Sequence, residues 1–235
     1  MSEALDKVRG VRELPVFPLP LVLFPGVPLP LHIFEERYRR MLADVRVSNN
    51  LFGLSYLDPN AAAGERPPAG HVGCATEVVE AQALPDGRSN ILTVGLVRYR
   101  VAEYVERGDP YLVARVEFFA DEGADAQLLA KRAEEVTEMF MRIARAMRTI
   151  NDERGGLPEL PQDDPERLSF LIAAVVEMDA DAKQQLLELR STTERLRRLY
   201  ALLSQAVEAY ETRAHTHDLA RGNGHAGKKI DLEEE

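Results

Sequence analysis

A run of seventeen residues near the start of the chain, LPVFPLPLVLFPGVPLP at 14–30, contains six prolines and restricts the fold more than any other feature. Each proline lacks the backbone N–H that a sheet ladder uses, so proline is confined to strand edges, strand starts and bends. The other residues of the run are large and apolar apart from one glycine, whereas disordered segments are poor in such residues. We therefore predict a buried, extended run with strands near 13–17 and 27–33.

The connection between these strands contains FPG at 24–26, which predicts a turn in which Gly26 takes a positive φ. Four apolar residues of the run are expected to fill a barrel interior: Phe17, Leu21, Phe24 and Leu29. After the second strand, the apolar residues change to helical spacing over 34–45.

A β pattern occupies most of residues 49–119. A strand at 49–57 precedes a surface loop at 58–70, and two longer strands flank PDGR at 85–88. Asp86 and Gly87 predict a two-residue hairpin turn there. Several short strands, one helix and many turns predict a small closed barrel, which leaves no long exposed edge.

The rest of the chain is helical in pattern, with helices expected at 126–150, from Pro165 onward, around 182–189, and after a capping box formed by Ser191 and Glu194. We expect five segments: a flexible N-terminus at 1–10, a barrel at 11–119, a linker at 120–125, a helical bundle at 126–212 and a disordered tail at 213–235.

Composition narrows the classes of function. The net charge is −10 and no segment is basic, which argues against binding to nucleic acid, because nucleic-acid binders neutralise phosphates. One cysteine suits a reducing compartment, and neither a signal peptide nor a membrane-spanning run is evident. We expect a cytoplasmic protein that binds neither nucleic acid nor membrane.

No catalytic constellation stands out. GNGHAGKK at 222–229 resembles a phosphate-binding loop, but it has lysine where a hydroxyl should ligate magnesium. His215, His217, Asp218 and His225 lack the rigid framing of a metal site, and Cys74 has no activating base nearby. We therefore expect no cofactor, no metal and no catalytic residue, which favours a binding protein over an enzyme.

The order of motifs resembles a known family. ELPVFPLPLVLFPGVPLPLHIFEERYRRML is similar to the start of the N-terminal, substrate-binding domain of ATP-dependent Lon proteases. The middle of that domain, with its Val-Gly strand, Asp-Gly hairpin and Gly-x-x-Arg strand, is matched by Gly73, Asp86, Gly87, Gly95 and Arg98. DAKQQLLELRSTTERLRRLYALL resembles its closing helices, so the resemblance covers about residues 12–208.

The resemblance implies an α+β protein with an N-terminal PUA-like β-barrel and a C-terminal α-helical bundle. It also implies a stand-alone polypeptide-binding module, because the sequence shows no ATPase or protease module after the bundle. Unfolded or hydrophobic segments would bind a shallow apolar surface or add to a strand edge. Four aromatic residues are the candidates for peptide binding: Phe24, Phe34, Tyr38 and Tyr104.

Other functions stay open at this point. The main alternative is an adaptor or assembly protein that binds a folded partner or, weakly, itself. RNA binding comes third, because PUA-like barrels occur in RNA-associated proteins although the charge disfavours it here. An enzyme comes fourth.

Overall fold

The structure is a computed structural model that describes residues 2–62, 64–153 and 155–224. The chain divides into two compact units. The first contains the residues up to Gly123 together with Glu166–Thr192, and the second contains Ala124–Pro165 and the described residues from Thr193 onward.

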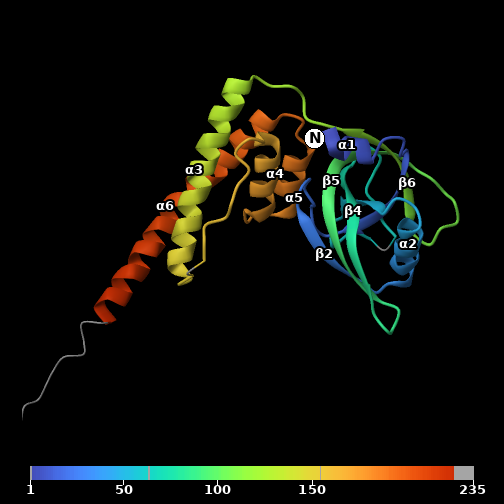
Figure 1. Cartoon of the computed structure of the whole chain (residues 1–235), viewed down its shortest axis with the longest axis horizontal. Coiled ribbons are helices and arrows are strands. Elements are labelled where there is room, and N and C mark those ends of the chain that lie inside the picture. The colour runs from blue at the N-terminus through green and yellow to red at the C-terminus, as the bar shows by residue number, and fades with distance from the viewer. Residues whose placement is uncertain (1, 63, 154, 225–235) are drawn as a thin grey trace, which may run out of the picture. The chain divides into compact units, whose positions relative to one another are not determined.

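Six strands form the sheet of the first unit: β1 (Glu13–Leu19), β2 (Pro28–Ile33), β3 (Leu51–Tyr56), β4 (Val72–Ala83), β5 (Ser89–Tyr104) and β6 (Leu112–Phe119). The strand order is β2-β5-β4-β3-β1-β6, and an additional pairing between β5 and β6 closes five of the strands into a barrel (Figure 1). β1 runs parallel to β3, and every other pairing is antiparallel. The predicted α+β class is confirmed.

β2 shows how proline shapes this sheet. It pairs with the first half of β5 and with no other described strand. Gly95 donates its N–H to the Val27 carbonyl (3.0 Å), so the backbone groups of Val27 face β5. Because backbone groups in a strand alternate in direction, those of Leu29 and Leu31 face β5 as well. Pro28 and Pro30 therefore fall at positions whose missing N–H would point away from β5, so they cost the sheet no hydrogen bond.

The barrel interior is built around Tyr99, which is fully buried and shares a hydrogen bond of 2.7 Å with the Ser55 hydroxyl. Its ring occupies space that two glycines leave open, because a Cβ on Gly53 or Gly73 would overlap its phenol group. Buried residues from all five barrel strands pack around it: Leu14, Val16, Leu51, Ala75, Val97, Val101, Ala114 and Val116.

The FPG turn lies against β5 at Gly95. Gly26 has a φ of +78° and donates its N–H to the Gly95 carbonyl at 2.8 Å. A Cβ on Gly95 would collide with the Phe24 carbonyl oxygen. The turn and the second glycine therefore require each other, although 69 positions separate Gly26 from Gly95 in the sequence.

Two helices from the first part of the chain, α1 and α2, pack against the barrel. α2 (Glu36–Arg46) covers the outer face with Tyr38, Met41, Leu42 and Val45, which contact Phe17 and other buried residues of the strands. α1 (Ser2–Lys7) is followed by Val8, which belongs to the interior cluster around Tyr99. The expectation of a flexible segment at 1–10 is therefore wrong for the described residues, because apolar burial orders it.

α4 (Pro165–Val175) and α5 (Ala180–Glu188) belong to the barrel unit, not to a separate bundle at 126–212. The reason is Arg98, which is 1% exposed and donates to the Leu187 carbonyl (3.0 Å), the Leu189 carbonyl and the Asp121 carboxylate. Asp121 lies in the predicted linker at 120–125, so the start of that segment is packed, whereas 122–125 are exposed and contain the boundary between the two units. The Phe24 ring also packs on Phe170 of α4, with ring centroids 6.0 Å apart.

The second unit consists of α3 (Ala126–Ile150), α6 (Thr192–Gly224) and the segment between α3 and α4. α3 and α6 lie side by side, and Arg142 forms a two-pronged ion pair with Glu211 at 2.8 and 2.9 Å (Figure 1). Residues 213–224 continue α6, so the predicted disorder is wrong there, and the remainder of the predicted tail, 225–235, lies outside the described residues. Among the described helices, none is long and apolar enough to cross a bilayer.

The β4–β5 hairpin turns one residue earlier than predicted. The Gly87 N–H bonds to the Leu84 carbonyl at 3.0 Å, which makes Pro85 and Asp86 the central residues of the turn. Gly87 follows with a φ of +79°. The expectation of a two-residue turn at Asp86 and Gly87 is thus corrected to a longer loop, because Pro85 presets the φ that its turn position needs.

The contact between the FPG turn and β5 predicts that Gly95→Ala lowers the free energy of unfolding by about 1–3 kcal/mol, because the added methyl group must displace backbone. Gly123→Ala is the matched control, since nothing lies within 4 Å of its Cβ position. Urea denaturation of both variants measures the difference. Equal midpoints for Gly95→Ala and the wild-type protein would contradict the contact.

Candidate functional site

The β1–β6 seam of the barrel opens at one end. The two strands pair from Glu13↔Arg115 to Val16↔Leu112, and no pairing follows. Continuing the same register would place Pro18 opposite Pro110. The chain on both sides of this seam lines the cavity described below.

The alternation of backbone groups explains why pairing stops. The Val116 N–H bonds to the Arg12 carbonyl at 2.9 Å, so the even-numbered residues of β1 turn their backbone groups toward β6. Pro18 is the next even-numbered residue after Val16, and Pro110 would lie opposite it in the β1–β6 register. Because neither proline has an N–H, the next hydrogen-bonded pair of the ladder cannot form.

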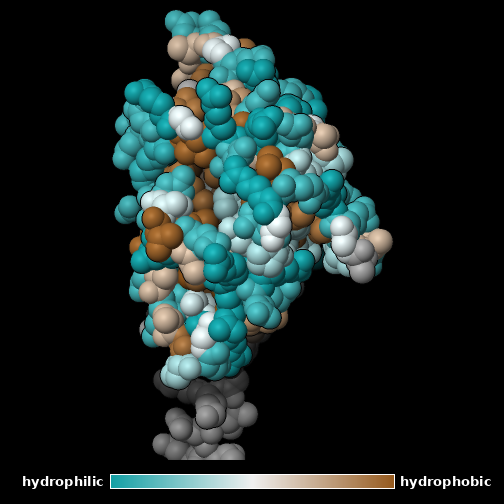
Figure 2. All heavy atoms as spheres, turned by 90° about the vertical axis from the view of Figure 1, so that its right-hand side faces the viewer, coloured by the Kyte–Doolittle hydropathy of each residue, from teal (hydrophilic) through white to brown (hydrophobic). Residues whose placement is uncertain are grey.

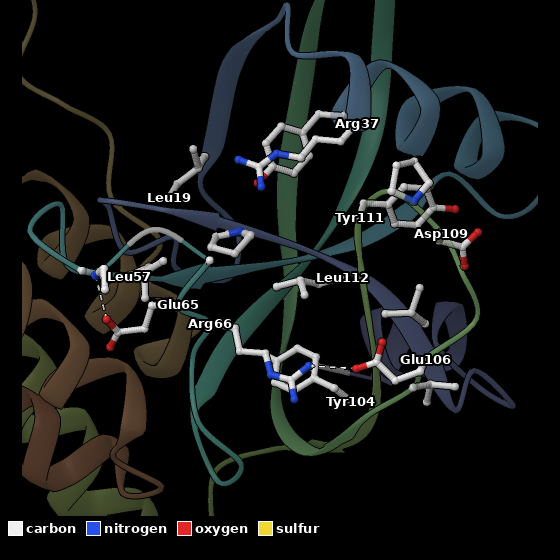
Figure 3. A pocket seen from close by; sticks show the side chains of 18 of the residues that line it. Leu19, Arg37, Leu57, Glu65, Arg66, Tyr104, Glu106, Asp109, Tyr111 and Leu112 are labelled. Carbon is white, nitrogen blue, oxygen red and sulfur yellow. Dashed lines mark hydrogen bonds and ion pairs between the residues drawn. The ribbon is translucent and has the colours of Figure 1, made fainter.

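A groove of about 490 Å³ lies at this open end (Figure 3). The ends of β1 and β5, the start of β6, the first turn of α2, residues of 57–62 and 64–66 after β3, and the loop at 105–111 line it. Its apolar and aromatic side chains include Leu19, Leu57, Leu112, Tyr38, Tyr104 and Tyr111. The volume lies in the range of cavities that hold a small organic molecule or a few side chains.

Two of the three tyrosines have their hydroxyl groups engaged within the protein. Tyr104 donates to the Pro67 carbonyl (2.8 Å), and Tyr111 donates to the Asp44 carboxylate (2.9 Å). Burial raises the pKa of Tyr104 to about 12, and burial together with Asp44 raises the pKa of Tyr111 to about 12. Both phenols therefore stay protonated, and they fix the rings in place instead of reacting.

Arginines cover two of the tyrosine rings. The Arg37 guanidinium lies 4.5 Å from the centre of the Tyr38 ring, and Arg66 lies 4.3 Å from the centre of the Tyr104 ring. Each arginine also has an acidic partner, Glu35 at 2.9 Å for Arg37 and Glu106 at 3.4 Å for Arg66. In Figure 3 the two arginines lie on opposite sides of Leu112. The groove therefore has an apolar floor between two compensated charges.

The structure brings together two of the four predicted aromatic residues. Tyr38, 6% exposed, and Tyr104 both line the groove. Phe34 is 59% exposed and stacks on His32, but it does not line the groove. Phe24 has no exposed surface, so its prediction as a binding residue is wrong in this structure, because its ring packs in the core on Phe170.

Sequence reasoning missed Leu57, Arg66, Tyr111 and Leu112. These residues fall in or beside loops, where neither helical nor strand periodicity marks a functional face. The available signal was a proline on each side of the seam, Pro18 and Pro110. That these two prolines lie opposite each other follows only from the register between β1 and β6.

The surface around the barrel shows no competing broad apolar area on the face drawn in Figure 2, where hydrophobic side chains occupy small separate patches among hydrophilic ones.

Cys74 is fully buried, and burial raises the pKa of its thiol to about 12, so the thiol stays protonated. Within residues 2–62, 64–153 and 155–224, no three His, Cys, Asp or Glu side chains gather as a metal site. His225 and most of GNGHAGKK lie outside these ranges.

Comparison with known proteins gives a family match. The model of the ATP-dependent protease La (LON) substrate-binding domain matches residues 13–205. The chain is 27% identical over 217 residues to Lon protease 2 of Herpetosiphon aurantiacus, covering 91% of this chain and 26% of that protein. It is 27% identical over 213 residues to the Lon protease of Azospirillum brasilense, covering 86% of this chain and 26% of that protein. The chain thus spans about a quarter of the length of these relatives.

Two solved structures share the fold. The crystal structure of a Lon N-terminal domain protein from Xanthomonas campestris has a TM-score of 0.58 and 21% identity, covering 81% of this chain and 98% of that chain. The N-terminal domain of the Lon protease from the Mycobacterium avium complex has a TM-score of 0.62 and 18% identity, covering 82% of this chain and 98% of that chain. The resemblance read from the sequence is confirmed.

The placement of the two phenylalanines predicts opposite effects on stability. Phe24→Ala should lower the free energy of unfolding by about 3–5 kcal/mol, because it leaves a cavity in the core. Phe34→Ala, the matched control, should change it by no more than about 0.5 kcal/mol, as is usual for exposed sites. Urea denaturation monitored by circular dichroism provides the comparison. Similar losses in the two variants would contradict the burial of Phe24.

Proposed function

Because the chain belongs to the family of ATP-dependent protease La (LON) substrate-binding domains, we propose that it binds polypeptide segments in the groove at the open β1–β6 seam. The segments are unfolded or hydrophobic stretches of other proteins. The observation that carries this proposal is a groove of about 490 Å³, lined by three leucines, three tyrosines and several charged side chains, in a member of a substrate-binding family.

The lining fits this ligand class. Leu19, Leu57 and Leu112 offer apolar contact to aliphatic or aromatic side chains, and hydrogen bonds hold the rings of Tyr104 and Tyr111 in place. The arginines at the rim already have acidic partners, so binding does not depend on an oppositely charged ligand. Such a surface favours apolar side chains over any one sequence.

The energetics predict weak binding. Burial of about 300 Å² of apolar surface contributes roughly 7 kcal/mol at about 25 cal/mol per Å², before the costs of association and ordering are subtracted. We therefore expect a dissociation constant in the micromolar range or weaker for one copy. Several copies acting together would bind a long unfolded chain more tightly.

We propose no catalytic role for residues 13–205, because the matched family model describes a substrate-binding domain. The purified chain should neither hydrolyse ATP nor degrade casein. A released-phosphate assay and gel electrophoresis measure the two activities. Activity that follows the protein peak through successive purification steps would contradict this expectation.

Fluorescence anisotropy with a labelled, permanently unfolded protein tests the binding proposal. Leu57→Ser should weaken binding about 5- to 10-fold, because it removes part of the apolar lining. Leu57 belongs to none of the buried clusters, so this variant is expected to fold. Val47→Ser is the matched control: Val47 is 87% exposed and lies outside the groove.

Binding should persist at raised salt, since salt screens surface charges but not apolar contact. A folded, labelled protein serves as the second ligand. Binding of the folded protein alone would contradict the proposal and favour the adaptor function, and equal affinity of Leu57→Ser and wild type would exclude the groove.

A further inference from the structure

We propose that the groove recognises the backbone of its ligand as well as its side chains: the Pro18 carbonyl accepts a hydrogen bond from a backbone N–H of an extended polypeptide segment. This inference rests on the proposed function and adds a specificity to it. Segments with proline at the position facing Pro18 would bind poorly, because proline has no N–H to donate.

The Pro18 carbonyl points toward the open seam. The Leu57 N–H bonds to the Leu19 carbonyl at 3.0 Å, so odd-numbered residues at this end of β1 face β3. Backbone groups alternate along a strand, so the Pro18 carbonyl faces the opposite side, toward the open seam. Pro18 itself lines the groove.

The seam supplies no backbone N–H opposite the Pro18 carbonyl. β6 begins at Leu112, and the residue that would lie opposite Pro18 in the β1–β6 register is Pro110. Pro110 has no N–H and cannot complete the pair. Pro20, directly after the end of β1, also lacks a donor and lines the same groove. This wall therefore offers a hydrogen-bond acceptor without the donors of an ordinary strand edge.

The ligand that fits this wall of the groove is an extended polypeptide chain. An acceptor beside an apolar floor fits an extended chain that carries both N–H donors and apolar side chains. Addition of a full strand requires donors and acceptors in alternation on the edge, and Pro18 and Pro20 remove the donors. The ligand therefore makes isolated backbone contact at Pro18, while its apolar side chains contact Leu57 and Leu112.

The same reasoning disfavours strand addition at the outer edge of β2. Pro28 and Pro30 remove the donors there as well, and both are exposed. Pro28 does not line the groove, so it provides a matched site for a proline substitution on an edge strand.

The ligand side of the proposal is tested with a short labelled peptide in which leucine and phenylalanine alternate with serine. A series of variants replaces one backbone amide at a time by an ester, which removes the N–H but keeps the side chain. We expect one or two positions at which the ester weakens binding about 3- to 10-fold, the effect of one lost hydrogen bond. Equal affinity across the whole series would overturn the backbone contact while leaving the proposed function intact.

The protein side is tested by Pro18→Ala combined with Pro110→Ala, which restores both N–H groups and allows the ladder to extend. We expect the two new amides at residues 18 and 110 to exchange more slowly than unprotected amides, and peptide affinity to fall about tenfold or more. Pro28→Ala should leave affinity unchanged. Affinity retained in a double variant with a closed seam would overturn the proposal.

If the double variant does not fold, the ester series decides the proposal, because it needs no variant of the protein. Failure of the wild-type protein to bind either this peptide or the unfolded protein would overturn the proposed function and this inference with it. Binding without sensitivity to any ester would overturn the inference alone.

Discussion

The missing backbone N–H of proline is the constraint on which the arrangement of the barrel depends. In β2, the prolines occupy positions that face away from the neighbouring strand, so the sheet forms without loss. At the end of β1, Pro18 and Pro110 occupy positions that would face each other across the seam, so the ladder ends. The missing N–H of proline is thus tolerated at the outer edge of β2, but it ends the pairing between β1 and β6. The groove lies where that pairing ends.

A second interaction fixes the helices that accompany the barrel. The Arg98 guanidinium is buried between the Phe119 and Phe170 rings, 4.6 and 5.3 Å from their centres, and bonds to the last carbonyls of α5. A buried charge is tolerated only with such partners, and Asp121 supplies the opposite charge. α4 and α5 therefore belong to the barrel unit, although α3 precedes them in the chain.

The sequence was sufficient to place most helices and strands, because periodicity and proline or glycine signals are local. The FPG turn, the helix at 36–46 and the β4–β5 hairpin all follow from such signals. It was not sufficient to separate Phe24 from Tyr38: both are aromatic residues in apolar surroundings, and only the tertiary structure buries one in the core and places the other in the groove. The unit boundary was also missed, because it depends on Arg98 bonding to residues about ninety positions away. The groove itself depends on strand register, which no local pattern specifies.

In the proposed function, a polypeptide binds where the β1–β6 seam opens. Hydrogen exchange measured by mass spectrometry, with and without a saturating amount of an unfolded, carboxymethylated protein, tests it most directly. We expect slower exchange around Leu57 and over 104–113, which line the groove, with little change in β2 or in α3 and α6. Protection confined to α3 and α6, or to the segment around Phe34, would contradict the claim.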